Sequence, residues 1–236
     1  MIGFVAAEVS EFSGLRRHLR NEKRPRLQAQ WTLSGELNGR HVILVANGPG
    51  PALARRAAEA IEELRNLETL VSYGFCGALD PDLRVNDIFI ASEVQSIAGT
   101  VACDELRRRP SAWNGTMPAP QRLISMDRVA ITAIEKSKLY ETGAKAVEME
   151  AGGVGAHAAS RHLPFHCIRV VTDSASDEFA LDFNQLRDQE GRFSRAKILA
   201  SAARRPLKLI PDLIRLNRRA ARAAQTLGDF VASCEF

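Results

Sequence analysis

The chain has 236 residues, of which 45% are hydrophobic and 25% are charged, and its formal net charge is +4. This length and composition are ordinary for a soluble protein with one large α/β domain or two small ones. No stretch approaches the roughly 18 uninterrupted apolar residues of a membrane span, and the first residues lack the basic lead of a signal peptide. We therefore expect a cytoplasmic protein.

Strand and helix patterns alternate through the first half of the chain. Asn38-Gly39 separates two strand patterns and is typical of a two-residue hairpin turn. The expected strands are residues 2–7, 30–37, 40–46, 69–73 and 87–94, and the expected helices are residues 11–20 and about 52–66.

The second half begins with a less regular stretch at about residues 98–122. Helix patterns then cover residues 129–139 and 151–162, strand patterns cover residues 146–149 and 165–172, and most of the C-terminal third is helix-like. This alternation predicts the α/β fold class, with a single domain over residues 1–236 in which a mixed central sheet is flanked by helices.

The cysteines do not form a metal-binding or cross-linking pattern. Cys76, Cys103, Cys167 and Cys234 are widely scattered, with no CxxC pair and no histidine at ligand spacing. This distribution argues against a zinc site and against a disulfide framework.

Two carboxylates lie at the edges of apolar, strand-like runs. Glu150 follows residues 146–149 and precedes small residues that could open a helix, and Asp173 follows residues 165–172. An open α/β sheet places its chemistry at such strand ends. The pair therefore suggests one group that holds a polyol and one that handles a proton. The alternative is that Glu150 starts a helix and Asp173 caps one.

Two glycine-containing loops could let the backbone approach a ligand. The loop at residues 47–51, which includes Gly48, precedes a helix whose N-terminus could face an anion. It lacks the lysine of a P-loop and the spacing of a dinucleotide fingerprint, so a plain turn is the alternative. Residues 74–77, Gly-Phe-Cys-Gly, leave the same two alternatives open.

The order of these motifs is similar to that of the nucleoside phosphorylase/nucleosidase superfamily. The branch it most resembles contains purine nucleoside phosphorylase and methylthioadenosine/adenosylhomocysteine nucleosidase. The similarity runs from Ile2 to about Glu178 and rests on residues 47–50 and 74–79, on Val147-Glu148-Met149-Glu150 and on Arg169-Val170-Val171-Thr172-Asp173.

The resemblance implies a role for each of several residues. Glu150 would accept hydrogen bonds from the ribose 2′- and 3′-hydroxyls, and Met149 would pack against the sugar. Asp173 would share a proton with purine N7, so that the base leaves as a neutral species. Val129 and Ala130 would offer backbone hydrogen bonds to the purine. In the same way, Phe75 would lie near the sugar and base.

The resemblance leaves the nucleophile open. Glu11 falls where the hydrolytic nucleosidases keep a glutamate that activates water, although it could be only the first residue of a helix. The positions that grip phosphate in the phosphorylases correspond here to Ser72 and Phe75, and no arginine accompanies Glu8 and Glu11. Inorganic phosphate is a candidate co-substrate, and no metal or organic cofactor is implied.

The C-terminal third resembles the hopanoid-associated phosphorylases, which are proposed to remove adenine from adenosylhopane, a nucleoside tethered to a polycyclic lipid. This resemblance predicts adenosylhopane phosphorolysis. The alternatives are a hydrolytic nucleosidase of the methylthioadenosine type and a non-catalytic nucleoside-binding protein. The family's usual assembly predicts a homo-oligomer.

A basic helical segment at about residues 204–224 has seven basic residues and one acidic residue between Arg204 and Arg222. Leu207, Ile210 and Ile214 could share one helical face, so the segment could lie peripherally on an anionic inner membrane. The alternatives are a helix packed on the domain with a solvated basic face and, least favoured without interleaved aromatic residues, a nucleic-acid surface.

Overall fold

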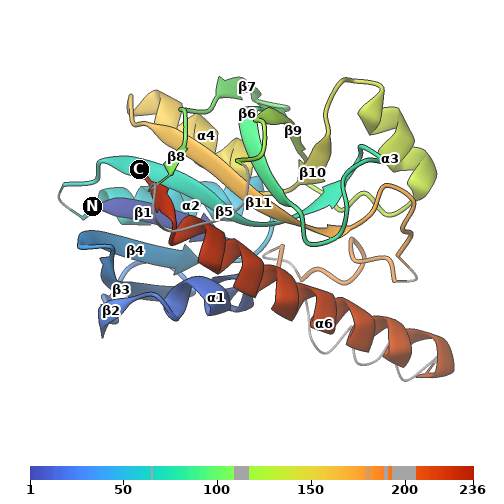
Figure 1. Cartoon of the computed structure of the whole chain (residues 1–236), viewed down its shortest axis with the longest axis horizontal. Helices are drawn as coiled ribbons and strands as arrows, with labels where there is room; N and C mark the ends of the chain where they lie inside the picture. Colours follow the sequence, from blue (N-terminus) through green and yellow to red (C-terminus); the bar gives the residue numbers. More distant parts are fainter. Residues whose placement is uncertain (65, 109–116, 180, 189–190, 193–205) are drawn as a thin grey trace.

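The computed structural model describes residues 1–64, 66–108, 117–179, 181–188, 191–192 and 206–236. Its centre is a ten-stranded mixed sheet with the order β10-β9-β6-β11-β5-β1-β4-β3-β2, in which β7 pairs with β6 (Figure 1). The strands are β1 (Ile2–Ala6), β2 (Arg20–Lys23), β3 (Trp31–Leu37), β4 (Arg40–Ala46), β5 (Thr69–Ala78), β6 (Ile88–Ser96), β7 (Gly99–Ala102), β9 (Gln121–Ser125), β10 (Ala146–Glu148) and β11 (Phe165–Asp173).

Helices cover both faces of this sheet. One buried cluster joins it to α2 and α4, and a second joins it to α1 and α6. The helical elements are η1 (Val9–Phe12), α1 (Ser13–Arg16), α2 (Pro51–Glu62), α3 (Ala133–Tyr140), α4 (Ala151–Ser160) and α6 (Pro206–Val231), and a small second sheet pairs β8 (Arg107–Arg108) with β12 (Cys234–Glu235). The single α/β fold with a mixed sheet is therefore confirmed.

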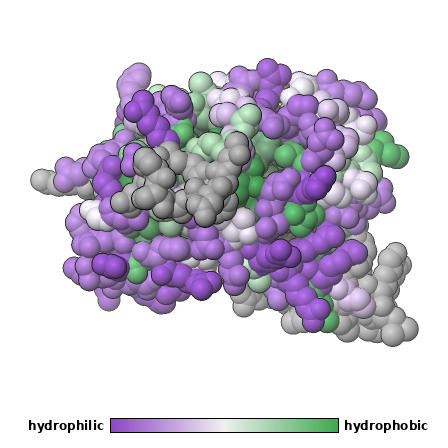
Figure 2. All heavy atoms as spheres, in the orientation of Figure 1, coloured by the Kyte–Doolittle hydropathy of each residue, from purple (hydrophilic) through white to green (hydrophobic). Residues whose placement is uncertain are grey.

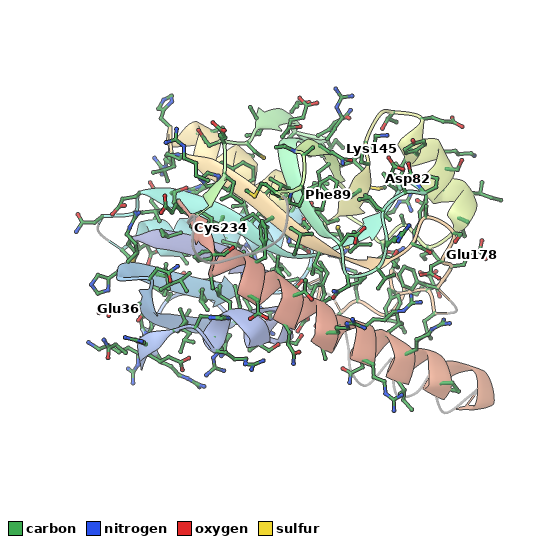
Figure 3. The ribbon with its side chains drawn as sticks, in the orientation of Figure 1. Glu36, Asp82, Phe89, Lys145, Glu178 and Cys234 are labelled. Atoms are coloured by element: carbon green, nitrogen blue, oxygen red, sulfur yellow. The ribbon has the colours of Figure 1, made fainter. Side chains whose placement is uncertain are left out.

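The central strands carry apolar residues continuously because both of their faces are buried. All five residues of β1 are buried, and β1 pairs in parallel with β4 and β5, while β5 pairs in parallel with β11. Figure 3 shows Phe89 inside the layers and Glu36 at the outer edge of the sheet. On the face seen in Figure 2, hydrophilic side chains dominate the periphery and hydrophobic ones gather near the middle.

The hairpin predicted around Asn38-Gly39 is present. Asn38 has a φ of 53° and Gly39 a φ of 78°, so both turn residues adopt the left-handed conformation that a type I′ turn requires. The turn sets the register in which Leu37 faces Arg40 across the β3–β4 pair.

Two expected helices differ from the structure. The helix expected over residues 11–20 is only η1 and α1, because the chain turns away to form the edge strand β2. The helix expected at 129–139 begins at Ala133, since Thr132 caps it by accepting a hydrogen bond from the Glu135 amide. The strand β9 (Gln121–Ser125) was not predicted, and the described part of residues 174–188 consists of turns rather than helix.

The basic C-terminal segment is mostly part of α6, a 26-residue helix (Figure 1). Leu213 and Leu216 face inward, whereas Ile214 is about half exposed. The side chains of Leu207 and Ile210, which were expected to share a face with Ile214, lie outside the described residues, as do Arg204 and Arg205. Within the part of the chain that the structure describes, no helix combines the length and apolar character needed to cross a membrane.

Candidate active site

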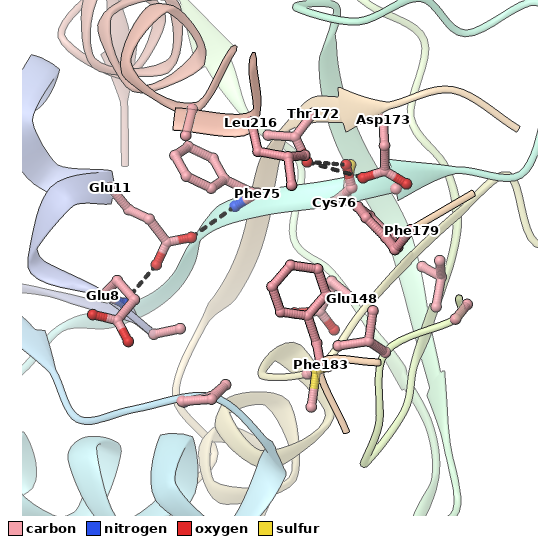
Figure 4. Close-up of a pocket in the computed structure, with 18 of the residues that line it drawn as sticks. Glu8, Glu11, Phe75, Cys76, Glu148, Thr172, Asp173, Phe179, Phe183 and Leu216 are labelled. Atoms are coloured by element: carbon pink, nitrogen blue, oxygen red, sulfur yellow. Dashed lines mark hydrogen bonds between the residues drawn. The ribbon is translucent and has the colours of Figure 1, made fainter. Parts of the chain in front are cut away.

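A cavity of about 440 Å³ opens where β1, β5 and β11 end, beneath α6 (Figure 4). These strands run in parallel, so the residues that follow their carboxyl ends converge at one edge of the sheet. The lining residues are Ala7, Glu8, Ser10, Glu11, Pro49, Phe75, Cys76, Gly77, Arg128, Val129, Ala130, Val147, Glu148, Met149, Glu150, Thr172, Asp173, Phe179, Phe183, Leu213, Leu216, Asn217 and Ala220.

Glu150 is held at one end of this cavity by the glycine loop. The Gly50 amide donates a 3.0 Å hydrogen bond to Glu150 Oε1. Gly50 has a φ of 105°, a conformation that favours glycine, and a Cβ there would lie 2.8 Å from Arg187 Nη2. Burial raises the pKa of Glu150 to about 8, and the neighbouring Glu148 carboxylate adds to the rise.

Glu148 supports the turn that carries Glu150. Its Oε2 accepts hydrogen bonds from the amides of Glu150 (2.8 Å) and Ala151 (2.9 Å), so a carboxylate occupies the N-terminus of α4. Arg169, which is fully buried on β11, donates to Glu148 and to Ser72 Oγ. A buried charge needs such pairing, and the network therefore fixes β5, β10 and β11 around the cavity floor.

Glu11 forms the wall beside Glu150 and projects from η1. Its Oε1 accepts a 3.0 Å hydrogen bond from the Phe75 amide, and its Oε2 accepts one of 2.8 Å from the Glu8 amide (Figure 4). Burial raises the pKa of Glu11 to about 7, against these hydrogen bonds and the positive charge of Arg169. A carboxylate with a pKa near neutrality suits a general base.

Asp173 lies at the end of β11 on another wall of the same cavity. Its Oδ1 accepts a 3.0 Å hydrogen bond from Thr172 Oγ1, and its Oδ2 is 2.5 Å from Lys136 Nζ. Burial raises the pKa of Asp173, and the Lys136 ammonium opposes this rise. A Cβ at Gly77 would lie 2.7 Å from Asp173 Oδ2, so glycine at that position makes room for the carboxylate.

The remainder of the cavity is apolar. The rings of Phe179 and Phe183 meet edge to face with centroids 5.4 Å apart. Phe183 also packs with Leu213 of α6, and Leu216 lines the cavity one turn further along the helix. One part of the cavity can therefore hold a polar, hydroxyl-bearing group while another holds an apolar one.

The predicted site residues are nearly all brought together. Asp173, Glu11, Glu150, Met149, Phe75, Val129 and Ala130 line the cavity. Gly48 does not line the cavity. Its amide donates a hydrogen bond to the Ala7 carbonyl, and the neighbouring Pro49 lines the cavity instead. The functional roles of these residues stay predictions.

Sequence reasoning missed three charged residues that organise the site. Glu148 and Arg169 belong to the quoted motifs but were given no role, although charges inside apolar strand runs signal a buried pair. Lys136 gave no such signal, because it lies in a helix with other charged residues and its burial depends on the chain beyond Asp173.

The fold and site define a three-layer α/β protein with a carboxylate-lined cavity at the ends of its parallel strands. The chain belongs to the phosphorylase superfamily, whose family model matches residues 2–136 and 123–204.

Relatives of known activity resemble the chain over most of its length. The 5′-methylthioadenosine/S-adenosylhomocysteine nucleosidase of Mycobacterium bovis is 26% identical, over 90% of this chain and 97% of its own. The enzyme of the same name from Psychromonas ingrahamii is 27% identical, over 78% of this chain and 90% of its own.

Solved structures share the fold. The 5′-methylthioadenosine/S-adenosylhomocysteine nucleosidase of Neisseria meningitidis, in complex with methylthio-immucillin-A, has a TM-score of 0.73 at 20% identity and covers 98% of this chain and 96% of its own. Futalosine hydrolase of Helicobacter pylori has a TM-score of 0.73 at 15% identity and covers 98% of this chain and 95% of its own.

Proposed function

We propose that this protein is an enzyme that cleaves the N-glycosidic bond of an adenosine-type nucleoside and releases adenine. The observation that carries the proposal is the placement of Glu11, Glu150 and Asp173 on the walls of one cavity. The curated nucleosidases that resemble the chain support the same reaction class.

Glu150 is proposed to bind the ribose. An ionised carboxylate accepts two hydrogen bonds and so matches a 2′,3′-diol. The Gly50 amide holds Oε1, while Met149 lies next to it on the cavity wall. Since burial raises the pKa of Glu150 to about 8, the two hydroxyls would also stabilise its charged form when substrate binds.

Asp173 is proposed to act on the base. Breaking the bond between C1′ and N9 leaves an electron pair on the purine, and a proton at N7 makes the base a neutral leaving group. Val129 and Ala130 line the same cavity. The Val129 backbone is already bonded to the Asn184 side chain, which accepts from its N–H at 2.8 Å and donates to its C=O at 3.1 Å, so Ala130 is proposed to meet the purine edge with its backbone.

Water is the nucleophile that the cavity favours, with Glu11 as its base. In the part of the chain that the structure describes, Arg128 is the basic residue of the lining, and it is already paired with Glu135. Glu8, Glu11 and Glu150 offer carboxyl groups instead of cationic partners, and a phosphate dianion without such partners is poorly held. Phosphorolysis, implied by the resemblance to the hopanoid-associated enzymes, is the alternative.

The substrate is proposed to carry an apolar 5′ substituent. Phe179, Phe183, Leu213 and Leu216 form an apolar wall, and two of these come from α6. Burying hydrocarbon there is favourable by about 25 cal/mol for each Å² removed from water. Adenosylhopane, whose 5′ carbon joins a polycyclic hydrocarbon, is the proposed substrate, because such a hydrocarbon would bury more apolar surface against this wall than a methylthio group would.

A peripheral membrane contact through α6 is proposed together with this substrate, because a lipid-linked nucleoside resides in a membrane. Arg215, Arg218 and Arg222 are exposed on α6, and Ile214 is about half exposed beside them. Sedimentation with anionic and with neutral vesicles tests this contact, and equal recovery from both would contradict it.

The test of the function is adenine release from adenosine and from a 5′-alkylthioadenosine, each with and without phosphate. We expect release without phosphate and a higher kcat/KM for the alkylated substrate. Asp173→Asn should lower kcat by about 10²–10⁴-fold while adenosine binding persists. Strict phosphate dependence would overturn water as the nucleophile, and release by Asp173→Asn at the wild-type rate would overturn Asp173 as the acid.

A further inference from the structure

Lys136 is a buried lysine placed directly behind the proposed acid. It lies in the first turn of α3 and is fully inaccessible to solvent. Its Nζ donates to Asp173 Oδ2 at 2.5 Å, to the Ser174 carbonyl at 2.8 Å and to the Asp177 carbonyl at 3.1 Å. An ammonium group has three hydrogens, so these acceptors satisfy it completely.

The surrounding chain is folded to hold this ammonium. Asp177 accepts hydrogen bonds from the Ser174 amide at 3.0 Å and from Arg219 of α6 at 2.8 Å. The loop that supplies both carbonyl acceptors is therefore held by its own backbone and by α6. Lys136 Nζ also lies 5.5 Å from the centre of the Phe179 ring. A desolvated lysine is costly unless it is paired, so this amount of support indicates a use for the charge.

We propose that Lys136 is a positioning residue that fixes the Asp173 carboxylate and stores the proton that Asp173 passes to the leaving base. The inference rests on the proposed function. A lone buried carboxyl can protonate the base only while it is itself protonated. The Lys136–Asp173 pair carries a transferable proton on Nζ even when Asp173 is a carboxylate.

As the bond between C1′ and N9 breaks, its electrons move into the purine, the Asp173 carboxylate takes a proton from Lys136 Nζ, and Asp173 passes a proton to N7. Adenine is then neutral, Asp173 is again a carboxylate and Lys136 is an amine. Asp173 lines the cavity, so the pair regains a proton from water after the base has left.

Other charged or titratable groups lie near the pair and stay unchanged in the test. They are Asp177 and Glu178 on the loop, Arg215 and Arg219 on α6, Arg128 at the cavity wall with its partner Glu135, and the Cys76 thiol on β5.

The experiment measures kcat and KM from pH 7 to pH 9 for wild type, Lys136→Met, Lys136→Arg and Lys138→Met, with a 5′-alkylthioadenosine as substrate. Lys138 is an exposed lysine on the same helix and serves as the matched control. We expect Lys136→Met to lose about 10²-fold in kcat at pH 8 with little change in KM, and to lose more as the pH rises. Lys136→Arg should keep the carboxylate in place but remain slow, because arginine does not release its proton.

Two results would overturn the proposal: a Lys136→Met profile with the same shape as wild type, or wild-type kcat in Lys136→Arg. If Lys136→Met does not fold, Lys136→Gln replaces it, since glutamine can donate to the same carbonyls without a charge.

Adenine binding provides a second measurement that needs no turnover. Titration calorimetry in two buffers of different ionisation enthalpy counts the protons exchanged on binding between pH 7 and pH 9. We expect this number to vary with pH in Lys136→Met and to stay constant in wild type, and identical behaviour would contradict the proposal. Wild-type protein that binds adenine but releases none from any substrate would instead contradict the proposed function.

Discussion

Glu11 shows how much of this site depends on burying a single carboxylate. Its two oxygens are held by the Phe75 and Glu8 amides, and burial raises its pKa to about 7. The same placement that makes it a suitable base at neutral pH makes its charge costly to the fold. The proposed function of Glu11 and the stability of the fold therefore oppose each other at this residue.

Replacing Glu11 by Gln should separate those two effects. Activity of wild type should rise with pH through about 7, where Glu11 becomes ionised, and Glu11→Gln should lose about 10²–10⁴-fold in kcat. The raised pKa contributes stability that is present below the unfolded value near 4.5 and is lost as the pH rises through about 7. At pH 8 the variant should therefore be more stable than wild type, by about 1–3 kcal/mol.

Urea unfolding at pH 5 and at pH 8 measures that difference in stability. The stability advantage of Glu11→Gln should be small at pH 5 and should grow toward pH 8. Equal stability of the two proteins at both values would contradict the cost assigned to the buried charge. Glu22→Gln, on the exposed edge strand β2, is the control.

Among the elements, α6 connects the roof of the cavity to the turn that carries Glu11. Gly228 of α6 and Gly14 of α1 touch backbone to backbone, since a Cβ at Gly228 would lie 2.2 Å from the Gly14 carbonyl carbon. Further along, the helix presents Leu213 and Leu216 to the cavity and its Arg219 to Asp177. The same helix thus closes the apolar wall and fastens the loop around Lys136.

A methyl group at Gly228 should disturb this arrangement. In an exposed helix, Gly→Ala adds up to about 1 kcal/mol of stability, whereas forcing a methyl group into a packed contact costs about 1–3 kcal/mol. We expect the second effect to win, so Gly228→Ala should lower the melting temperature and raise KM for the 5′-alkylthioadenosine more than for adenosine. Gln225→Ala, exposed on the same helix, is the control, and a stabilised Gly228→Ala would contradict the contact.

The elements that the sequence predicted best are those whose signal is local. The Asn38-Gly39 turn and the apolar run of β11 depend on neighbouring residues, and both are present. The prediction of a helix at 11–20 was wrong because the conformation of this segment depends on a distant contact. Gly14 is packed against α6, more than 200 residues later. The carboxylates at strand ends could be predicted because each follows an apolar strand pattern in its own neighbourhood. Lys136 was missed because its partner, Asp173, is distant in the sequence.

At the scale of the whole molecule, one exposed apolar residue bears on assembly. Ile97 is fully exposed at the tip between β6 and β7. It borders a second cavity of about 440 Å³ whose other walls include Arg55 of α2 and Ala156 of α4. Further apolar residues line this hollow, among them Pro51, Ala98 and Met126, and with Ile97 they form an apolar patch of the kind found at interfaces, so the predicted homo-oligomer is proposed to form here.

Light scattering after size-exclusion chromatography measures the assembly. Wild type should run as an oligomer, and Ile97→Asp should shift the equilibrium toward the 25.9 kDa monomer because it buries a charge in the contact. Ile134→Asp, at another exposed isoleucine, should leave the mass unchanged. A wild-type monomer at micromolar concentration would contradict the proposal.

The contact between Gly14 and Gly228 also orders events during synthesis. Glu11 leaves the ribosome well before the part of α6 that packs on its segment, which is translated more than 200 residues later. A nascent chain that already contains β1, β5 and β11 therefore has every strand that the cavity needs and still lacks its roof. We expect a nascent chain that ends before α6 to lack the proposed nucleoside-cleaving activity, which should appear only once α6 has emerged.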